Sequence, residues 1–195
     1  VNTFTHILEG YKVADKMAHH GVSGASTFSD WWAYKFEVME AIPQNATLMS
    51  RWNIPVGINS DDAEMGRRLN QEAAKSVKYG GMSDVEAFKM CTLNPAKMLH
   101  VDQYVGTLEE GKDADIVVWT ANPLSVYASV TATYVDGTCY YSNEDAFDKM
   151  TFINQDKLRL WKLMQAAKTS GDASVPASAS PENTYYSCGG QEENH

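Results

Sequence analysis

Three features are scarce in this 195-residue sequence: paired cysteines, long apolar runs and clusters of basic residues. The three cysteines are odd in number and far apart, which favours neither a disulfide framework nor a Cys-x-x-Cys metal site. No apolar run approaches the about 18 residues that a membrane-spanning helix needs. The 25 acidic and 16 basic side chains give a net charge of −9, which argues against binding to nucleic acid or to an anionic membrane surface.

The beginning of the sequence lacks a recognisable targeting segment. Residues 1–8 contain no basic stretch and no signal-peptide core. We expect these residues to lie in the middle of a fold, and the sequence gives no indication of the compartment. The chain is too short for a complete (β/α)₈ barrel of about 250 residues with a further domain.

The first half of the sequence alternates short apolar segments with helical patterns, which is typical of a parallel α/β sheet. Ser83 and Glu86 form the pattern of a capping box, and Asn94 before Pro95 is expected to cap a short helix. The segments expected to be strands are residues 4–8, 22–28 and 54–59. The segments expected to be helices are residues 11–18, 33–41, 45–52 and 63–79.

The second half changes character after residue 104. Residues 115–119 and 126–135 predict strands, and Asp136-Gly137 predicts a type I′ hairpin into a strand at 139–141. A last helix over residues 155–168 is expected to bury Leu158, Trp161 and Met164. Residues 169–195 are rich in Ser, Ala, Gly and Pro without periodicity, so we expect a disordered tail.

Two polar side chains follow predicted strands of the first half. His6 falls at the end of the first strand, and Asp61 comes shortly after the third. The carboxyl ends of parallel strands face the ligand crevice, and imidazole and carboxylate are ligands that zinc takes. Each residue also has a purely structural interpretation. His6 could be a core histidine bonded to a carbonyl, and Asp61 could cap the following helix, a role expected of Asp62.

Four segments, in the same order along the chain, resemble segments of the amidohydrolase superfamily. Residues 5–12 (THILEGYK) resemble the sixth-strand histidine region of imidazolonepropionase-like and prolidase-like members, and residues 57–61 (GINSD) resemble the eighth strand, which ends in Asp. Residues 92–99 (TLNPAKML) are similar to the helix after the last barrel strand. Residues 105–118 (VGTLEEGKDADIVV) are similar to the return into the small β-sandwich domain.

The resemblance implies a metal-dependent hydrolase of amide or cyclic amide C–N bonds. His6 would be the sixth-strand metal ligand. Asp61 would be the eighth-strand aspartate, which touches the metal and takes the proton of the attacking water. The implied cofactor is a divalent metal, Zn²⁺ by its ligand types, with one or two ions. Ser29, Asp30 and Trp32 would form part of the substrate pocket rim, although Trp31 and Trp32 could simply pack between helices.

The sequence departs from the superfamily over a large part of the site. It contains no His-x-His pair, and we expect that pair, the fourth-strand Lys or Glu and the fifth-strand His of the superfamily to lie N-terminal to Val1. We therefore expect the C-terminal part of a TIM barrel, about strands six to eight, followed by part of a small flanking β-sandwich, and we expect this fragment alone to be inactive. The expected partners are a small amide or dipeptide-like substrate and either further copies of the chain or a missing N-terminal half. The expected units are residues 1–104 (barrel part), 105–150 (β-sandwich strands), 151–168 (helix) and 169–195 (tail).

Two other functions remain open at this stage. The chain could be a non-catalytic truncated module or subunit, or the parent enzyme could be a deaminase of a nitrogen heterocycle. A reading frame that continues upstream into a strand ending in His-x-His would favour an enzyme. Release of ammonia would separate a deaminase from an amide hydrolase.

Overall fold

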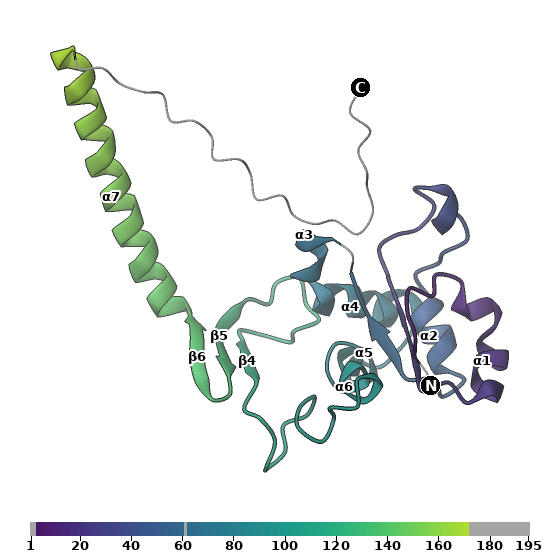
Figure 1. Cartoon of the computed structure of the whole chain (residues 1–195). Helices are drawn as coiled ribbons and strands as arrows, with labels where there is room; N and C mark the ends of the chain where they lie inside the picture. Colours follow the sequence, from purple (N-terminus) through teal and green to yellow (C-terminus); the bar gives the residue numbers. More distant parts are fainter. Residues whose placement is uncertain (1–2, 61, 172–195) are drawn as a thin grey trace.

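The computed structural model describes residues 3–60 and 62–171 and contains two small sheets with helices packed around the first (Figure 1). The first sheet is parallel and has the order β1-β2-β3. Its strands are Thr3–Phe4 (β1), Gly24–Thr27 (β2) and Val56–Ile58 (β3). Strand order therefore follows chain order, and each crossover carries a helix, as in a βαβ unit.

Helices connect these strands and continue after the third. The first crossover holds a 3₁₀ turn, η1 (Gly10–Lys12), and α1 (Ala14–His20), and the second holds η2 (Phe36–Val38) and α2 (Asn45–Ser50). After β3 come α3 (Ala63–Gly66), α4 (Leu69–Gly80), α5 (Asp84–Lys89) and α6 (Leu93–Met98). No helix in the described part of the chain is long and apolar enough to cross a membrane.

The second sheet is antiparallel, with the order β4-β5-β6, and leads into a long helix. The elements are β4 (Ile116–Trp119), β5 (Val130–Val135), β6 (Thr138–Ser142) and α7 (Asn143–Ser170). Asp136 and Gly137 have φ angles of 49° and 74°, and Val135 pairs with Thr138, so the two-residue type I′ hairpin is confirmed.

The core lies between the first sheet and its helices. Ala25, Val56 and Ile58 point to the helical side, where they meet methionines from three different helical segments. Each of these side chains is at most 7% exposed. Methionine suits such a junction because its flexible side chain fills gaps between elements that meet at different angles. The methionines are Met17, Met49 and Met90.

Several local predictions about the first sheet were wrong in detail. The first strand is not a buried segment of residues 4–8: β1 ends at Phe4, which is 40% exposed, and His6 already has a left-handed φ of 55°. The helix expected over 33–41 is reduced to η2, since Ala33 is also left-handed and Phe36 is 90% exposed, leaving little apolar surface for a helix to bury.

Helix capping was predicted with mixed success. Asp62 caps α3 by accepting hydrogen bonds from the backbone N–H groups of Glu64 and Met65 at 2.8 and 2.9 Å, as expected. Ser83 caps α5. The helix expected over 63–79 is divided into α3 and α4. Asn94 is not a cap: it lies inside α6, and its amide bonds to strand β3.

The long helix α7 differs most from expectation. It begins at Asn143 rather than at Gln155, because the Ser142 hydroxyl caps it directly after β6 by accepting a hydrogen bond from the Asp145 N–H. It projects away from the second sheet (Figure 1). Its apolar side chains are therefore not buried against the described residues. Leu158, Trp161 and Met164 are 52, 54 and 65% exposed.

Candidate functional site

The carboxyl edge of the first sheet is where the sequence places the candidate site. His6 follows β1 at this edge, and its exposed ring packs on Phe28, which follows β2, with ring centroids 5.3 Å apart. Asp61, the other predicted ligand, lies outside the described residues. The structure thus brings His6 to the end of the second strand, where it contacts Phe28, a pairing that no sequence pattern predicted.

An aromatic stack extends from this edge. Phe28 stacks on Trp31 with centroids 4.8 Å apart and an interplanar angle of 22°, and the Trp31 indole N–H donates to Met65 Sδ at 2.8 Å. Trp31 is therefore a packing residue, as its structural interpretation predicted. Trp32 is different: it is 40% exposed and meets Tyr79 edge-on, with 5.8 Å between centroids. Of these two tryptophans, Trp32 presents the larger accessible surface.

Ser29 and Asp30, predicted for the pocket rim, are held by helix α4. The Ser29 backbone N–H donates to Glu72 Oε2 at 2.9 Å, and Ser29 is only 3% exposed. Asp30 forms an ion pair with Lys75, which also contacts Glu72 Oε1 at 2.8 Å. Both rim residues are thus tied to a charged network inside the protein. Sequence reasoning missed Glu72 and Lys75; their i, i+3 spacing was visible, but their burial was not.

Burial dominates the electrostatics of this network. Glu72 is 3% exposed, and its desolvation raises the pKa of the carboxyl group, against the opposing effects of the Ser29 N–H and the charge of Arg68. Desolvation also lowers the pKa of Lys75. Both shifts favour the uncharged forms, since a charged group loses hydration when it is buried.

One further polar group lies buried beside the edge. The side-chain amide of Asn59, directly after β3, has both its nitrogen and its oxygen buried without a hydrogen-bond partner among the described residues. The Ser29 hydroxyl, after β2, and the Ser76 hydroxyl, on α4, are also buried without a partner among the described residues. Buried polar atoms are usually paired in folded proteins.

The described residues offer an incomplete donor set for a metal ion. Nowhere in residues 3–60 and 62–171 do three His, Cys, Asp or Glu side chains come together in a metal-binding group. His19, His20 and His100 are exposed on or beside helices. The imidazole of His6 is a suitable zinc ligand, but a catalytic zinc takes about three protein ligands. The described residues would supply part of the ligand set of a metal centre rather than all of it.

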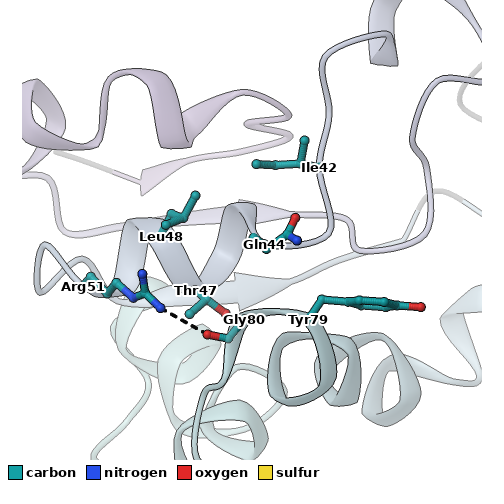
Figure 2. Close-up of a pocket in the computed structure, with 7 residues that line it drawn as sticks. All are labelled: Ile42, Gln44, Thr47, Leu48, Arg51, Tyr79 and Gly80. Carbon is teal, nitrogen blue, oxygen red and sulfur yellow. Dashed lines mark hydrogen bonds between the residues drawn. The ribbon is translucent and has the colours of Figure 1, made fainter.

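A pocket lies away from this edge, between α2 and α4 (Figure 2). It has a volume of about 460 Å³, and the guanidinium of Arg51 donates to the Gly80 carbonyl at 3.2 Å on its wall. Its lining contains no histidine, cysteine or carboxylate, so it lacks the ligands of a hydrolytic metal site. The lining residues are Ile42, Gln44, Thr47, Leu48, Arg51, Tyr79 and Gly80.

Comparison with known proteins shows the family to which the chain belongs. The model of the amidohydrolase family matches residues 6–140, from His6 through the second sheet. The chain belongs to the amidohydrolase family. This confirms the resemblance inferred from the four sequence segments.

Curated relatives are similar over part of their length. The chain is 29% identical to amidohydrolase tasK of Hapsidospora irregularis over 123 residues, which are 63% of this chain and 12% of that protein. It is 38% identical to the imidazolonepropionase of Thermoplasma volcanium over 85 residues, 43% of this chain and 21% of that enzyme. The chain thus spans about a fifth or less of these relatives.

Solved structures with the same fold also extend beyond it. An amidohydrolase from Thermotoga maritima matches 72% of this chain and 37% of its own, with a TM-score of 0.67 and 24% identity. An adenosine deaminase from Xanthomonas campestris, solved with bound zinc, matches 81% of this chain and 42% of its own, with a TM-score of 0.55 and 17% identity. At this identity the likeness concerns the fold alone.

Proposed function

We propose that this chain is the C-terminal part of a metal-dependent hydrolase that cleaves amide or cyclic amide C–N bonds. The observation that carries the proposal is the position of His6, at the carboxyl edge of a parallel sheet and at the start of the family match. In (β/α)₈ enzymes catalytic groups sit at this edge. Strands β1, β2 and β3 would then correspond to the sixth, seventh and eighth strands of the barrel.

Two residues would supply the chemistry of this part. His6 would donate a ring nitrogen to a divalent metal, Zn²⁺ by ligand type, in a centre of one or two ions. Asp61 would be a second donor, and its carboxylate would take a proton from the attacking water and pass it to the leaving nitrogen. A bound divalent cation supplies hydroxide at neutral pH, because it lowers the pKa of water to about 7.

Trp32 is the rim residue best placed to meet a substrate. Asp30 is paired with Lys75, and Ser29 is buried, so both residues would shape the rim rather than bind substrate directly. The half-exposed ring of Trp32 offers an apolar surface for a small amide or dipeptide-like molecule. The similarity to imidazolonepropionase supports a cyclic amide as one such substrate class.

The division of the chain follows from this proposal. Residues 1–104 would complete a barrel, and residues 105–150 would add strands to a flanking β-sandwich, with residues 151–168 as helix and 169–195 as a tail. The unit of residues 105–150 includes the first turns of α7, because this helix starts at Asn143. Further copies or the remaining barrel part would cover the free edges of the first sheet.

Two alternatives have specific support. A heterocycle deaminase is favoured by 50% identity to the adenine deaminase of Methanococcoides burtonii over 38 residues, 20% of this chain and 6% of that enzyme. A non-catalytic module is favoured by the incomplete donor set of the described residues. Product analysis separates the first alternative, since a deaminase releases ammonia.

Zinc binding tests the proposal on a polypeptide that carries this segment together with the rest of a barrel. We expect His6→Ala and Asp61→Asn to reduce the zinc that elemental analysis finds in this purified polypeptide. His19→Ala is the control, because His19 is exposed on α1. Equal zinc content in wild type and His6→Ala would contradict the metal role of His6.

Activity is tested on a polypeptide that carries this segment together with the rest of a barrel. There Asp61→Asn should abolish turnover of amide substrates while circular dichroism shows an unchanged fold. Unchanged turnover would remove Asp61 as the base.

A further inference from the structure

Asn45, at the start of α2, is the most completely bonded side chain near the candidate site. Its amide nitrogen donates to the Ile7 carbonyl at 2.7 Å and to the Thr27 hydroxyl at 2.9 Å, and its oxygen accepts from the Tyr11 N–H at 2.8 Å. The residue is 1% exposed. A buried amide that loses one of these hydrogen bonds leaves a polar group without a partner, which is unfavourable.

The partners of Asn45 lie in the segment that follows His6 and on the strand whose end supports the His6 ring. Ile7 is the residue directly after His6, and Tyr11 lies in the 3₁₀ turn that follows. Thr27 directly precedes Phe28, the aromatic residue on which the His6 ring packs. One side chain therefore holds both the backbone that carries His6 and the strand end that supports its ring.

The backbone at His6 needs such support. Its φ of 55° is in the left-handed region, which is uncommon for residues other than glycine and is unfavourable. Both backbone polar groups of the next residue are bonded: Ile7 N–H donates to the Ser26 carbonyl at 2.9 Å, and the Ile7 carbonyl accepts from Asn45. These two bonds fix the course of the chain immediately after His6.

We propose that Asn45 is a positioning residue, which orients the His6 imidazole at the carboxyl edge of the sheet by clasping the His6–Tyr11 turn to β2. This inference rests on the proposed function, in which His6 is a metal donor. Asn45 itself touches neither metal nor substrate. Groups that orient a metal ligand typically change metal affinity by about 10–100-fold when they are removed.

The test uses nuclear magnetic resonance of the histidine rings in the full 195-residue chain. His6→Gln assigns the His6 signals. We expect these signals to carry a ring-current shift from Phe28, which Asn45→Ala removes. Asn45→Ser is a milder second variant, since its hydroxyl keeps polar character but cannot reach both segments.

Thr47→Val is the matched control. Thr47 is a buried polar residue on the same helix, but its hydroxyl bonds to the Ser76 carbonyl of α4 at 3.3 Å and not to the His6 turn. It should disturb stability without moving the His6 signals. If both Asn45 variants leave the His6 signals at their wild-type positions, the positioning role is overturned.

A zinc titration followed on the same signals separates the two proposals. We expect zinc to perturb the His6 ring of the wild-type chain, with affinity about 10–100-fold lower in the Asn45 variants and unchanged in Thr47→Val. A second outcome is that zinc leaves the His6 signals of the wild-type chain unmoved, while the Asn45 substitutions by themselves still shift those signals. In that case the metal role of His6 is wrong and the positioning role of Asn45 is kept. If zinc binds equally well to all variants, the clasp does not serve the metal.

Discussion

The side-chain amide of Asn94 donates a 2.8 Å hydrogen bond to the carbonyl oxygen of Val56, 38 positions earlier in the chain. Val56 lies on β3, and its carbonyl points away from β2. The next outward-facing group of the same strand, the Ile58 N–H, donates to the Met90 carbonyl at the end of α5, at 3.1 Å. Helical groups thus satisfy polar groups on the outer edge of β3 that would otherwise lack partners.

Removal of the Asn94 amide should destabilise the protein. Asn94→Ala leaves the Val56 carbonyl buried without its donor, so we expect a loss of about 1–3 kcal/mol in the free energy of unfolding. Urea denaturation measures the loss. Lys97→Ala, on the exposed side of the same helix, should stay within about 0.5 kcal/mol of wild type. A loss of the same size in both variants would contradict the role of the Asn94–Val56 bond.

Stability should depend on the protonation of Glu72. Burial raises its pKa in the folded state above the ordinary value of 4.5, so the folded protein binds a proton more tightly than the unfolded chain. The contribution of Glu72 is then fully present below the unfolded pKa and falls as the pH rises through the folded pKa. We expect wild type to lose stability relative to Glu72→Gln over this range, measured by urea denaturation in steps from pH 4 to pH 8.

Glu86→Gln is the matched control for Glu72. Glu86 also pairs with a lysine three residues later, with 2.6 Å between Glu86 Oε1 and Lys89 Nζ, but its side chain is 56% exposed. Water solvates its charge in both states, so the stability difference from wild type should hardly change with pH. A pH dependence of the same slope in both variants would rule out burial as the cause.

The two cysteines in the described part of the chain should differ in reactivity. Cys91 donates its thiol to the Leu69 carbonyl at 3.1 Å, and burial raises its pKa to about 12, with the charge of Glu72 acting in the same direction. Because the thiolate is the reactive form, Cys91 should be far less reactive at pH 8 than an exposed thiol. Cys139 is exposed.

Alkylation with iodoacetamide checks this difference in a Cys188→Ser background, so that two thiols are compared. Cys139 should react much faster than Cys91 in the native protein, and the rates should converge in guanidinium chloride. Peptide mass spectrometry assigns the label. Equal native rates would mean that the Cys91 thiol is not held in its buried bond.

The packing of α4 on α2 should be sensitive to a single methyl group. A Cβ on Gly80 would run into the side chain of Thr47 across the helix contact. We expect Gly80→Ala to destabilise the protein by about 1–3 kcal/mol, because a filled interface has no room for it. Thermal denaturation measures the effect. Gly66→Ala meets open space in α3 and should be neutral or stabilising by up to about 1 kcal/mol. Equal effects would contradict close packing at Gly80.

Local structure was largely determined by the sequence. The order of strands and helices was predicted correctly except over 33–41, where η2 replaces a helix, and over 63–79, where α3 and α4 replace one helix. The Asp62 cap and the hairpin at Asp136-Gly137 were also predicted correctly. These features depend on residues close together in the chain: an N-cap needs one side chain and the next turn, and a type I′ turn needs two residues that tolerate positive φ. The family was also readable from four segments, because each is a short continuous motif, and the family match to residues 6–140 confirms the family.

The tertiary structure determined the features that depend on contacts between residues far apart in the sequence. The sequence could not show that Asn45 would reach Ile7 and Thr27, that Asn94 would bond Val56 rather than cap a helix, or that Glu72 would be buried under Ser29. Amide and carboxylate side chains occur both on protein surfaces and in buried hydrogen-bond networks. The partners of these side chains lie 18 to 43 positions away in the sequence. Burial decides between these two arrangements, because a buried polar group without a hydrogen-bond partner is unfavourable in free energy. Burial is a property of the assembled fold.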